Sequence, residues 1–402
     1  MKKIMPTVSM LLLVFLSSPG SGYRIIHKTG VGTRAYSMAN NYVAVAQDLS
    51  ALYWNPAGLA FLPVREFQIS LFGQSQKSRS SLFGTEEIDH LQRLHLMQGG
   101  LVYAFPTSRG GFSLAGSYQN PVVFDDISTF SGTYGDTTVS STYRTFGGLN
   151  FWSGGFGLQV APGMGIGATM SIITGREQTR DTYSKTASGS GEQFDDNIET
   201  GYLGYDLRAG LLYSYRDKAF WGARLVFPRR IRFREEFSED FPDTAGRLYS
   251  SYEAALGYAM ELPYFTFSTE VHIRLPYTVV FPSEKILSKS GASSAKAGGG
   301  VGFEAPLFVN STLVRAGYAY EEFDRYSFVA KYADQPFDEA WAPDGVDASQ
   351  ERHLVTTGFA WLVAQWNFEI GYGYQFWEVE TNNTLTERYG FHRFLVSFSM
   401  RF

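Results

Sequence analysis

The strongest constraint on the fold is an alternation of apolar and polar residues that recurs through most of the chain. In the segment 201–215, leucine, tyrosine and alanine occupy every second position from Leu203 to Tyr215. A period of two indicates β-strands with one apolar face, because a helix would repeat every 3.6 residues. The same alternation at 365–377 and 388–402 extends the prediction of strands to the last residue.

Fourteen segments of this kind are found, and the connections between them alternate in length. Short connections such as Thr107–Gly110 and Ala364 alternate with long ones such as 75–93 and 176–199. This pattern is typical of outer-membrane barrels, which have short periplasmic turns and long outer loops. The predicted strands are 64–74, 94–106, 111–121, 146–160, 163–175, 200–215, 219–231, 247–261, 264–274, 297–308, 312–322, 352–363, 365–377 and 388–402.

The composition agrees with strands that cross a membrane. Aromatic residues make up 16% of the chain and charged residues 18%, while the mean hydropathy is only −0.15. No segment after the N-terminal leader reaches the roughly 18 consecutive apolar residues that a membrane-spanning helix needs. Strands in lipid must close on themselves, because the amide groups of an open edge would lack partners. We therefore predict an all-β fold, a 14-stranded antiparallel transmembrane β-barrel.

The first residues resemble an export signal. Lys2 and Lys3 precede an apolar run at 10–16, and small residues follow up to Gly22. A basic start, a short apolar stretch and a small-residue cleavage zone define a secretory signal peptide. We predict that residues 1–22 are cleaved on export and that the mature chain is an integral protein of the bacterial outer membrane.

The mature chain would begin with about forty residues, 23–63, that precede the first strand. A barrel of fourteen strands is too wide to fill its interior with wall side chains alone. We expect 23–63 to form an N-terminal hatch, or plug, in the lumen of a barrel spanning 64–402. The residues of this segment that need burial are Tyr42, Val43, Val45, Leu49, Leu52, Tyr53, Trp54, Leu59 and Phe61.

This N-terminal segment also carries a recognisable motif. The stretch 32–60 resembles the hatch of the FadL-type outer-membrane transporters of long-chain fatty acids, a family whose barrel has fourteen strands. The four residues Asn55, Pro56, Ala57 and Gly58 match the Asn-Pro-Ala motif of that hatch. Proline also pushes the residue before it out of the helical region, as a turn within a folded plug requires.

The resemblance implies passive outer-membrane transport of long-chain fatty acids or other hydrophobic small molecules, with the Asn55–Gly58 motif as part of the gate. In this family a kink in the third strand opens the wall sideways. Here that strand would be 111–121, in which Gly116 and Pro121 weaken strand pairing. Phe402 closes the last apolar row and resembles the signal that barrel-assembly machinery reads. The implied partners are a fatty-acid-like ligand, outer-membrane lipids and that machinery.

Two alternative functions remain open on the sequence. Related barrels with the same opening serve in protein secretion, so the chain could shuttle exported proteins. A general porin or a surface adhesin is the other alternative, although the apolar N-terminal segment argues against an open pore.

Several charged residues fall on the lumen-facing side of their strands. They are predicted to form ion-pair networks that hold the plug, or to include a cation, such as Arg208 or Arg315, that meets a carboxylate head group. These residues are Asp206, Arg208, Glu253, Glu270, Arg274, Glu304, Arg315, Glu369 and Arg393.

Other kinds of chemistry find little support. The chain has no cysteine, and its six histidines lack metal-ligand spacing. The run from Gly30 to Ala35 fits Gly-x-Gly-x-x-Ala but has no preceding strand, so it does not predict a dinucleotide site. A net charge of −5 gives no basic excess for nucleic acid. We predict no enzymatic activity, no catalytic residue, no metal and no cofactor.

Overall fold

The computed structural model describes residues 23–24, 27–187, 190–237, 244–275, 278–280, 295–307, 309–323, 326–327, 350–381 and 385–402. The predicted signal peptide therefore lies outside the described residues. No helix in the described part of the chain has the length and apolarity to cross a membrane.

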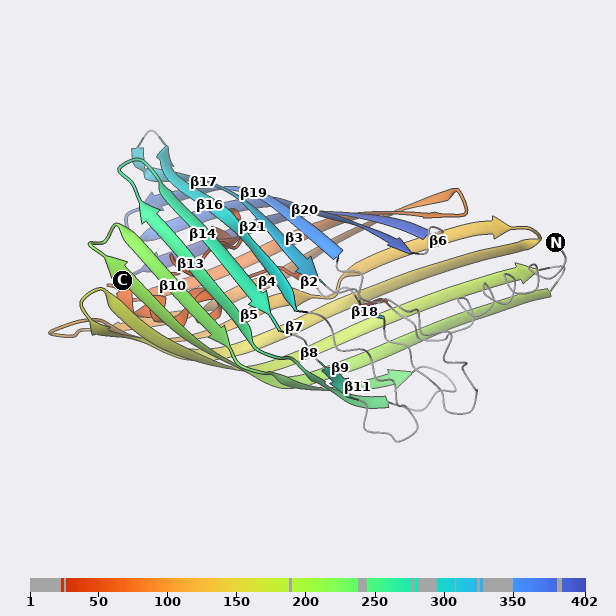
Figure 1. The fold of residues 1–402 in the computed structure, drawn as a ribbon, viewed down its shortest axis with the longest axis horizontal. Helices are drawn as coiled ribbons and strands as arrows, with labels where there is room; N and C mark the ends of the chain where they lie inside the picture. Colours follow the sequence, from red (N-terminus) through yellow and green to blue (C-terminus); the bar gives the residue numbers. More distant parts are fainter. Residues whose placement is uncertain are drawn as a thin grey trace.

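Within these ranges the chain forms a closed antiparallel barrel of fourteen strands, which confirms the predicted fold class and strand number (Figure 1). Ten strands are continuous: β3 (Glu66–Leu82), β4 (Thr85–Phe105), β7 (Thr137–Ala161), β8 (Met164–Ala187), β9 (Ser190–Tyr215), β16 (Lys296–Leu307), β17 (Val309–Phe323), β19 (Gln350–Val363), β20 (Trp366–Thr381) and β21 (Leu385–Arg401). Four are interrupted: β5 (Phe112–Val123) with β6 (Asp126–Tyr134), β10 (Ala219–Val226) with β11 (Arg230–Phe237), β12 (Thr244–Tyr249) with β13 (Glu253–Glu261), and β14 (Thr266–Arg274) with β15 (Thr278–Val280).

The barrel closes where its last strand, β21, pairs with its first, β3, from Leu385 opposite Leu82 to Arg401 opposite Glu66. We call the end at which β3 begins and β21 ends the proximal rim, and the opposite end the distal rim. The connections at the proximal rim are short, as predicted. One of them, between β9 and β10, is a tight turn with positive φ at Arg216 and Asp217 (54° and 52°).

The outer surface of the barrel carries apolar side chains at alternate positions, and the inner surface is mainly polar. On β8, Met170 and Ile172 point outward and are 61% and 54% exposed, whereas the adjacent Thr169 and Ser171 are buried. An apolar outer band with a polar interior is the arrangement of a membrane-spanning β-barrel. Other exposed members of this band are Trp152, Leu203, Leu256, Val271, Phe394 and Val396.

The strands reach further toward the distal rim than the sequence analysis predicted. Strands β7, β8 and β9 are 25, 24 and 26 residues long and, together with β6, project beyond the strands on the opposite side of the barrel (Figure 1). The predicted loops 75–93, 122–145 and 176–199 are therefore wrong, because most of their residues belong to strands. Only Phe83 and Gly84, for example, separate β3 from β4.

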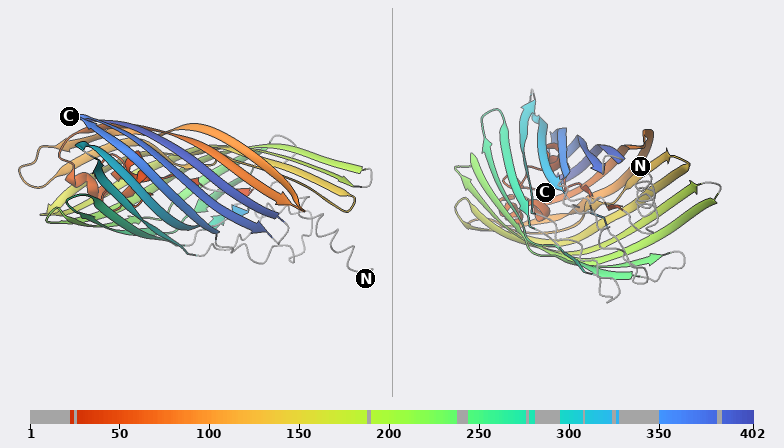
Figure 2. Two further views of the ribbon diagram at one scale, coloured as in Figure 1. Left: turned by 90° about the horizontal axis from the view of Figure 1, so that it is seen from above. Right: turned by 45° about the vertical axis from the view of Figure 1, so that its right-hand side comes forward.

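The segment before the barrel folds inside the ring of strands (Figure 2). It contains two short helices, α2 (Thr33–Ser37) and α3 (Ala51–Trp54), and the 3₁₀ helix η1 (Pro56–Phe61). Two short strands precede them. β1 (Tyr23–Arg24) pairs with β18 (Tyr326–Ser327), and β2 (His27–Lys28) pairs with β5.

The barrel wall has glycines where this segment comes closest. At each of them a Cβ atom would overlap an atom of the segment, so a larger residue would hold the segment away from the wall. These wall glycines are Gly157, Gly167, Gly210, Gly222, Gly302, Gly317 and Gly358.

We predict that a charge in the outer band destabilises the barrel. Met170→Arg places a cation in lipid and should lower the free energy of unfolding by about 2–4 kcal/mol. Gln178→Arg, on the same face of β8 but beyond the band, should change it by less than about 0.5 kcal/mol. Urea unfolding of protein refolded into liposomes, followed by tryptophan fluorescence, measures both. Equal effects of the two variants would contradict the assignment of the band.

Candidate functional site

The Asn55–Gly58 motif links the N-terminal segment to the barrel wall. Asn55 caps η1, with its side-chain oxygen accepting a hydrogen bond from the backbone N–H of Ala57 (3.2 Å). Its amide nitrogen donates to the carbonyl oxygens of Val43 (2.8 Å) and of Leu211 on β9 (3.1 Å). Asn55 is fully buried, and all its hydrogen-bonding atoms have partners. The residue thus ties two parts of the segment to each other and to the wall.

The other motif residues satisfy tight packing. Pro56 occupies the first turn of η1, where its missing N–H is not needed. A Cβ atom on Gly58 would overlap the carbonyl oxygen of Ala46 in the same segment. Ala57 is fully buried beside the wall. The four residues predicted as a gate are therefore brought together as one packed unit.

Charged side chains connect the segment to the wall on the side of α2. The guanidinium of Arg34 lies 2.8 Å from the carboxylate of Glu304 on β16. Arg315 on β17 bridges that carboxylate (2.6 Å) and Glu369 on β20 (2.9 Å). Removing one member of such a buried group leaves an uncompensated charge, which costs about 3–5 kcal/mol.

A second set of charges binds the backbone of the segment. The carboxylate of Glu270 accepts hydrogen bonds from the N–H groups of Tyr42 and Val43, each at 3.0 Å. Arg208 donates to the carbonyl oxygen of Tyr53, and its guanidinium lies 3.9 Å from the centre of the Tyr53 ring. Asp206 neutralises Arg208 at 2.6 Å. Of the nine lumen-facing charges predicted from the sequence, all but Arg393 form ion pairs or bind the segment in this way.

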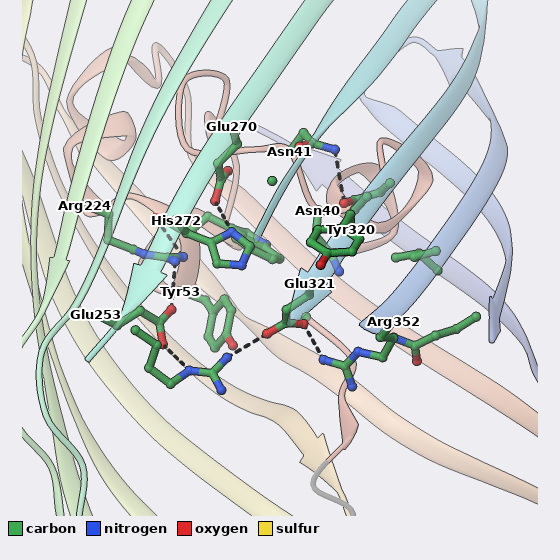
Figure 3. Close-up of a pocket in the computed structure, with 18 residues that line it drawn as sticks. Asn40, Asn41, Tyr53, Arg224, Glu253, Glu270, His272, Tyr320, Glu321 and Arg352 are labelled. Carbon is green, nitrogen blue, oxygen red and sulfur yellow. Dashed lines mark hydrogen bonds and ion pairs between the residues drawn. The ribbon is translucent and has the colours of Figure 1, made fainter. Parts of the chain in front are cut away.

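Two cavities lie on either side of the segment. The cavity toward the distal rim has about 80 Å³ and is bordered by α3 and by β10, β13, β14, β17 and β19 (Figure 3). A chain of alternating charges surrounds it: Arg224, Glu253, Arg274, Glu321 and Arg352. The cavity toward the proximal rim has about 190 Å³ and is bordered by Arg34, Asp48 and Glu66 among others. Both are much smaller than the bore of the barrel, so the segment fills most of the lumen between them.

Burial also determines the protonation state of Tyr36 in the segment. It raises the pKa of Tyr36 to about 12, against the opposing effect of Arg393, so the phenol is neutral at physiological pH. The segment therefore presents a hydroxyl donor, and not an anion, to the wall at this point.

The third strand leaves the regular pairing of the barrel at one place. Strand β4 pairs with β5 only as far as Gln98 opposite Gln119. A bulge then interrupts the pairing of β5 with β7 between Gln119 and Val122, and Pro121 lies in it. Beyond the bulge, β2 of the N-terminal segment pairs with Val122 and Val123 in place of β4. Gly116, in contrast, pairs regularly with Leu101 and Gly154 on its two neighbours.

Side chains cross the resulting gap between β4 and β6. Asp89 on β4 accepts hydrogen bonds from the backbone N–H of Thr129 on β6 (2.6 Å) and from its hydroxyl (2.9 Å). His95 on β4 contacts the carboxylate of Asp125, which also accepts from the N–H of Gly147 on β7 (3.1 Å). Among the described residues β6 has a backbone ladder with β7 only. The wall is therefore closed here by side chains, without a backbone ladder.

Lumen-facing side chains of β3 contact β6. The Ser78 hydroxyl donates to the carbonyl oxygen of Ile127 (2.7 Å), and the hydroxyl oxygens of Ser80 and Ser128 lie 3.3 Å apart. The sequence analysis did not single out these residues. The sequence does show polar residues at every second position here, but they fall in the stretch 75–93, which is predicted as a loop.

An apolar cluster faces the lumen next to this gap. It lies on β5, β7, β8 and β11 and at Phe124 between β5 and β6, and it is a part of the lumen wall that suits a hydrophobic molecule. Its members are Val122, Phe124, Leu149, Phe151, Ile173 and Ile231, with Tyr202 packed against them.

Phe402 lies at the proximal rim. Its backbone N–H donates to the carbonyl oxygen of Arg65 (3.0 Å) and extends the seam between β21 and β3 by one step. The side chain is 56% exposed. Its recognition by barrel-assembly machinery stays a prediction.

Known proteins resemble this chain in structure and not in sequence. No model of a known protein family matches the sequence, and no curated protein matches it. Solved structures do match: a FadL homologue from Pseudomonas aeruginosa has a TM-score of 0.62 and 12% identity, covering 94% of this chain and 99% of that one. The chain therefore has the fold of the FadL-type barrels, as the resemblance in 32–60 implied.

Two toluene transporters give similar values. TodX from Pseudomonas putida has a TM-score of 0.61 at 16% identity, and TbuX from Ralstonia pickettii has 0.60 at 12% identity. For each, 94% of this chain and 99% of the other chain are covered. The similarity thus extends over nearly the whole of each chain.

We predict that Gly58→Ala displaces the N-terminal segment from the lumen. The added Cβ would overlap the Ala46 carbonyl, and no side-chain rotation relieves a backbone overlap, so packing should lose about 1–3 kcal/mol or more. Trypsin should then cut the folded protein after Arg34, as mass spectrometry of the fragments reports. Gly154→Ala, at a wall glycine with open space around it, is the matched control and should leave Arg34 protected. Equal protection of both variants would contradict the packing described.

Proposed function

We propose that this chain is an integral outer-membrane protein through which hydrophobic small molecules pass without an energy source. One observation carries the proposal: the lumen is filled by a segment held through hydrogen bonds and ion pairs, next to a gap in the wall that apolar residues border. The proximal rim would face the periplasm, because both chain ends of the barrel lie there. Residues 1–22 would direct export, and barrel-assembly machinery would insert the chain among outer-membrane lipids.

The segment 23–63 would act as the hatch, with Asn55, Pro56, Ala57 and Gly58 as its hinge against the wall. The segment is buried against the wall on several sides, so we expect a ligand to cross only when the segment shifts or the wall opens. The anchors of the hatch include hydrogen bonds and ion pairs, which water can replace when the segment moves.

The gap beside β6 would be the second route. A ligand from the distal rim would first reach the cluster that contains Phe124 and Phe151. This cluster lies next to the only break in backbone pairing that we find between neighbouring described strands of this region. Separation of β6 from β4 breaks side-chain contacts such as Asp89 with Thr129 and no ladder. The bulge at Pro121 would be the hinge, while the regular pairing at Gly116 assigns that residue no part in the opening.

The solved structures support a hydrophobic ligand. The names of these proteins describe a FadL homologue and two toluene transporters, and all three proteins have this fold. Long-chain fatty acids are the substrate we favour, because the stretch 32–60 resembles the hatch of the FadL-type transporters of those acids. A general porin agrees less well with a filled lumen, and no feature of the described residues favours a protein-secretion role over transport.

We predict that the N-terminal segment prevents the leakage of small polar molecules while hydrophobic ligands are transported. In proteoliposomes the full mature chain should take up labelled oleate and exclude small sugars. Deletion of 23–62 should admit sugars and raise the conductance of planar bilayers, because no other described element fills the lumen at that level. A deletion variant that folds and still shows the low conductance of the full chain would contradict a hatch role.

We predict that fixing β6 to β3 blocks the lateral route. The chain has no cysteine, so the pair Ser80→Cys and Ser128→Cys supplies the only thiols. Oxidation should stop oleate uptake, and a reductant should restore it. The matched pair Ser153→Cys and Ser171→Cys joins hydroxyls 2.8 Å apart on the regularly paired β7 and β8, and should leave uptake unchanged. Undiminished uptake by the verified β3–β6 cross-link would place the route past the hatch instead.

A further inference from the structure

The cavity toward the proximal rim is bordered by more carboxylates than guanidinium groups. Two of each belong to the ion-pair group beside α2, which consists of Arg34, Arg315, Glu304 and Glu369. A further pair on this border, Arg401 and Glu66, is joined at 2.9 Å. Asp48 of the N-terminal segment is the remaining charge, so the border of the cavity carries one negative charge in excess.

Asp48 is a buried carboxylate without a cation partner. It is 7% exposed, and it forms no ion pair within the described ranges of the chain. Its Oδ1 accepts hydrogen bonds from the N–H and the hydroxyl of Ser50 (2.9 and 2.5 Å), and its Oδ2 accepts one from the hydroxyl of Tyr42 (2.6 Å). A carboxylate has about four acceptor positions. These three hydrogen bonds therefore leave one position on Oδ2 for a ligand.

A row of neutral oxygen groups lies on the wall of the same cavity. The register places Gln68 on β3 and Asn367 on β20 on either side of Ser399 on β21. Gln68 is 3% exposed, and its side-chain oxygen has no hydrogen-bond partner in the described part of the protein. The side-chain oxygen of Asn367 also lacks a described partner, while its amide nitrogen donates to Glu369 (3.3 Å). Buried polar atoms are normally paired, so these acceptors indicate a ligand that donates.

The backbone of the N-terminal segment holds Asp48 close to this row. The N–H of Leu49, the next residue, donates to the carboxylate of Glu66 at 3.2 Å. Glu66 lies two positions before Gln68 on the same buried face of β3. Asp48 and Gln68 therefore border one cavity, the first from the segment and the second from the wall.

The groups that meet at this cavity are those that a hard metal cation prefers. Carboxylate and carbonyl oxygens suit Mg²⁺, Ca²⁺ and Mn²⁺. No three carboxylate or histidine side chains in the described ranges form a metal-binding group, so the protein does not supply a full set of ligands. Magnesium does not need one, because it keeps several waters and is bound through one or two carboxylates. A cavity of about 190 Å³ has room for an ion and several waters.

We propose that Asp48 binds a hydrated divalent cation of the magnesium type, whose waters donate to the side-chain oxygens of Gln68 and Asn367. A divalent cation offsets the excess negative charge, and its waters satisfy the two amide oxygens. Because Asp48 belongs to the hatch and the amides belong to β3 and β20, the ion joins the hatch to the wall at the proximal end. This site goes beyond the transport function and does not depend on the molecule that is carried.

Manganese is the probe for this site, because it shares the oxygen ligands of magnesium. Electron paramagnetic resonance detects the free ion, whose sharp signal is lost on binding. Mn²⁺ is titrated into the detergent-purified full mature chain in a buffer that contains sodium chloride, which suppresses weak binding to surface charges. We expect a single bound ion per chain, and we expect Mg²⁺ to displace it.

Two variants remove the proposed contacts from opposite sides of the cavity. Asp48→Asn removes the charge and should abolish Mn²⁺ binding. Gln68→Met removes an acceptor of a metal-bound water and should weaken binding about tenfold or more, as for other groups that support a metal through its ligands. Gln76→Met is the matched control, because Gln76 is buried on the same face of β3 but does not border the cavity. It should bind Mn²⁺ as the unaltered protein does.

A protease assay tests whether the ion holds the hatch. Arg34 borders the same cavity, so tryptic cleavage after it reports movement of the segment. A ligand that binds only the closed state at ten times its Kd reduces the open population about tenfold. Removal of the ion with EDTA should therefore speed this cleavage by about that factor, and Mg²⁺ should reverse the effect. In Gln68→Met the same Mg²⁺ concentration should protect less.

The outcomes separate the ion site from the transport function. Absence of Mn²⁺ binding by the unaltered protein, or undiminished binding by Gln68→Met, overturns the ion site and leaves hydrophobic transport intact. Displacement of Mn²⁺ by Ca²⁺ but not by Mg²⁺ overturns the hydrated ion. Binding without any change in cleavage overturns the role of the ion in holding the hatch. Should Asp48→Asn lack the strand signal in circular dichroism, the folded Gln68→Met variant decides.

Discussion

The pairing of backbone amides is the constraint on which the rest of this structure depends. In lipid each unpaired N–H or C=O group is costly, so strands can cross a membrane only when every edge is joined to a neighbour. The seam between β21 and β3 meets this requirement along its whole length. The third strand meets this requirement differently. Beyond Gln119, β2 pairs with Val122 and Val123, and side chains such as Asp89 accept hydrogen bonds from backbone N–H groups of β6. A wall closed by such contacts can open without disrupting the ladders around it.

The filling of the lumen follows from the width that this pairing imposes. Fourteen strands enclose more space than wall side chains can occupy, and the N-terminal segment fills it with an apolar core of its own that includes Leu49, Leu52 and Leu59. Glycines in the wall then allow its backbone to approach, as at Gly167 beside Pro56. Hydrogen bonds and ion pairs join the two, and so do apolar contacts, because Val102, Ala115 and Leu212 of the wall belong to the same buried cluster as the core of the segment. The segment is thus a small folded unit held in the lumen by polar and apolar contacts together.

The sequence predicted the number of strands well, but it predicted their length and the partners of the lumen-facing charges less well. Alternation revealed the fourteen strands and the proximal turns, because in the membrane band one face of each strand meets lipid and the other the lumen. Beyond the band both faces are polar, so 176–199 resembled a loop, although 176–187 and 190–199 belong to strands β8 and β9. Arg208 and Arg393 were equivalent by their position on a strand. Asp206 neutralises Arg208 from two positions earlier on the same strand, whereas the register between β21 and β3 places the neutral amide of Gln74 beside Arg393.

The contacts between the segment and the wall set the cost of moving the hatch. Separating two apolar surfaces in water costs free energy in proportion to their area, whereas the Glu270 carboxylate and the N–H groups of Tyr42 and Val43 exchange one hydrogen-bond partner for water at a small net cost. Tyr36 and Ala39 of the segment pack against Phe72 and Leu395 of the wall. A movement of the whole segment therefore costs more than the exchange of its hydrogen bonds, because it exposes these apolar contacts to water.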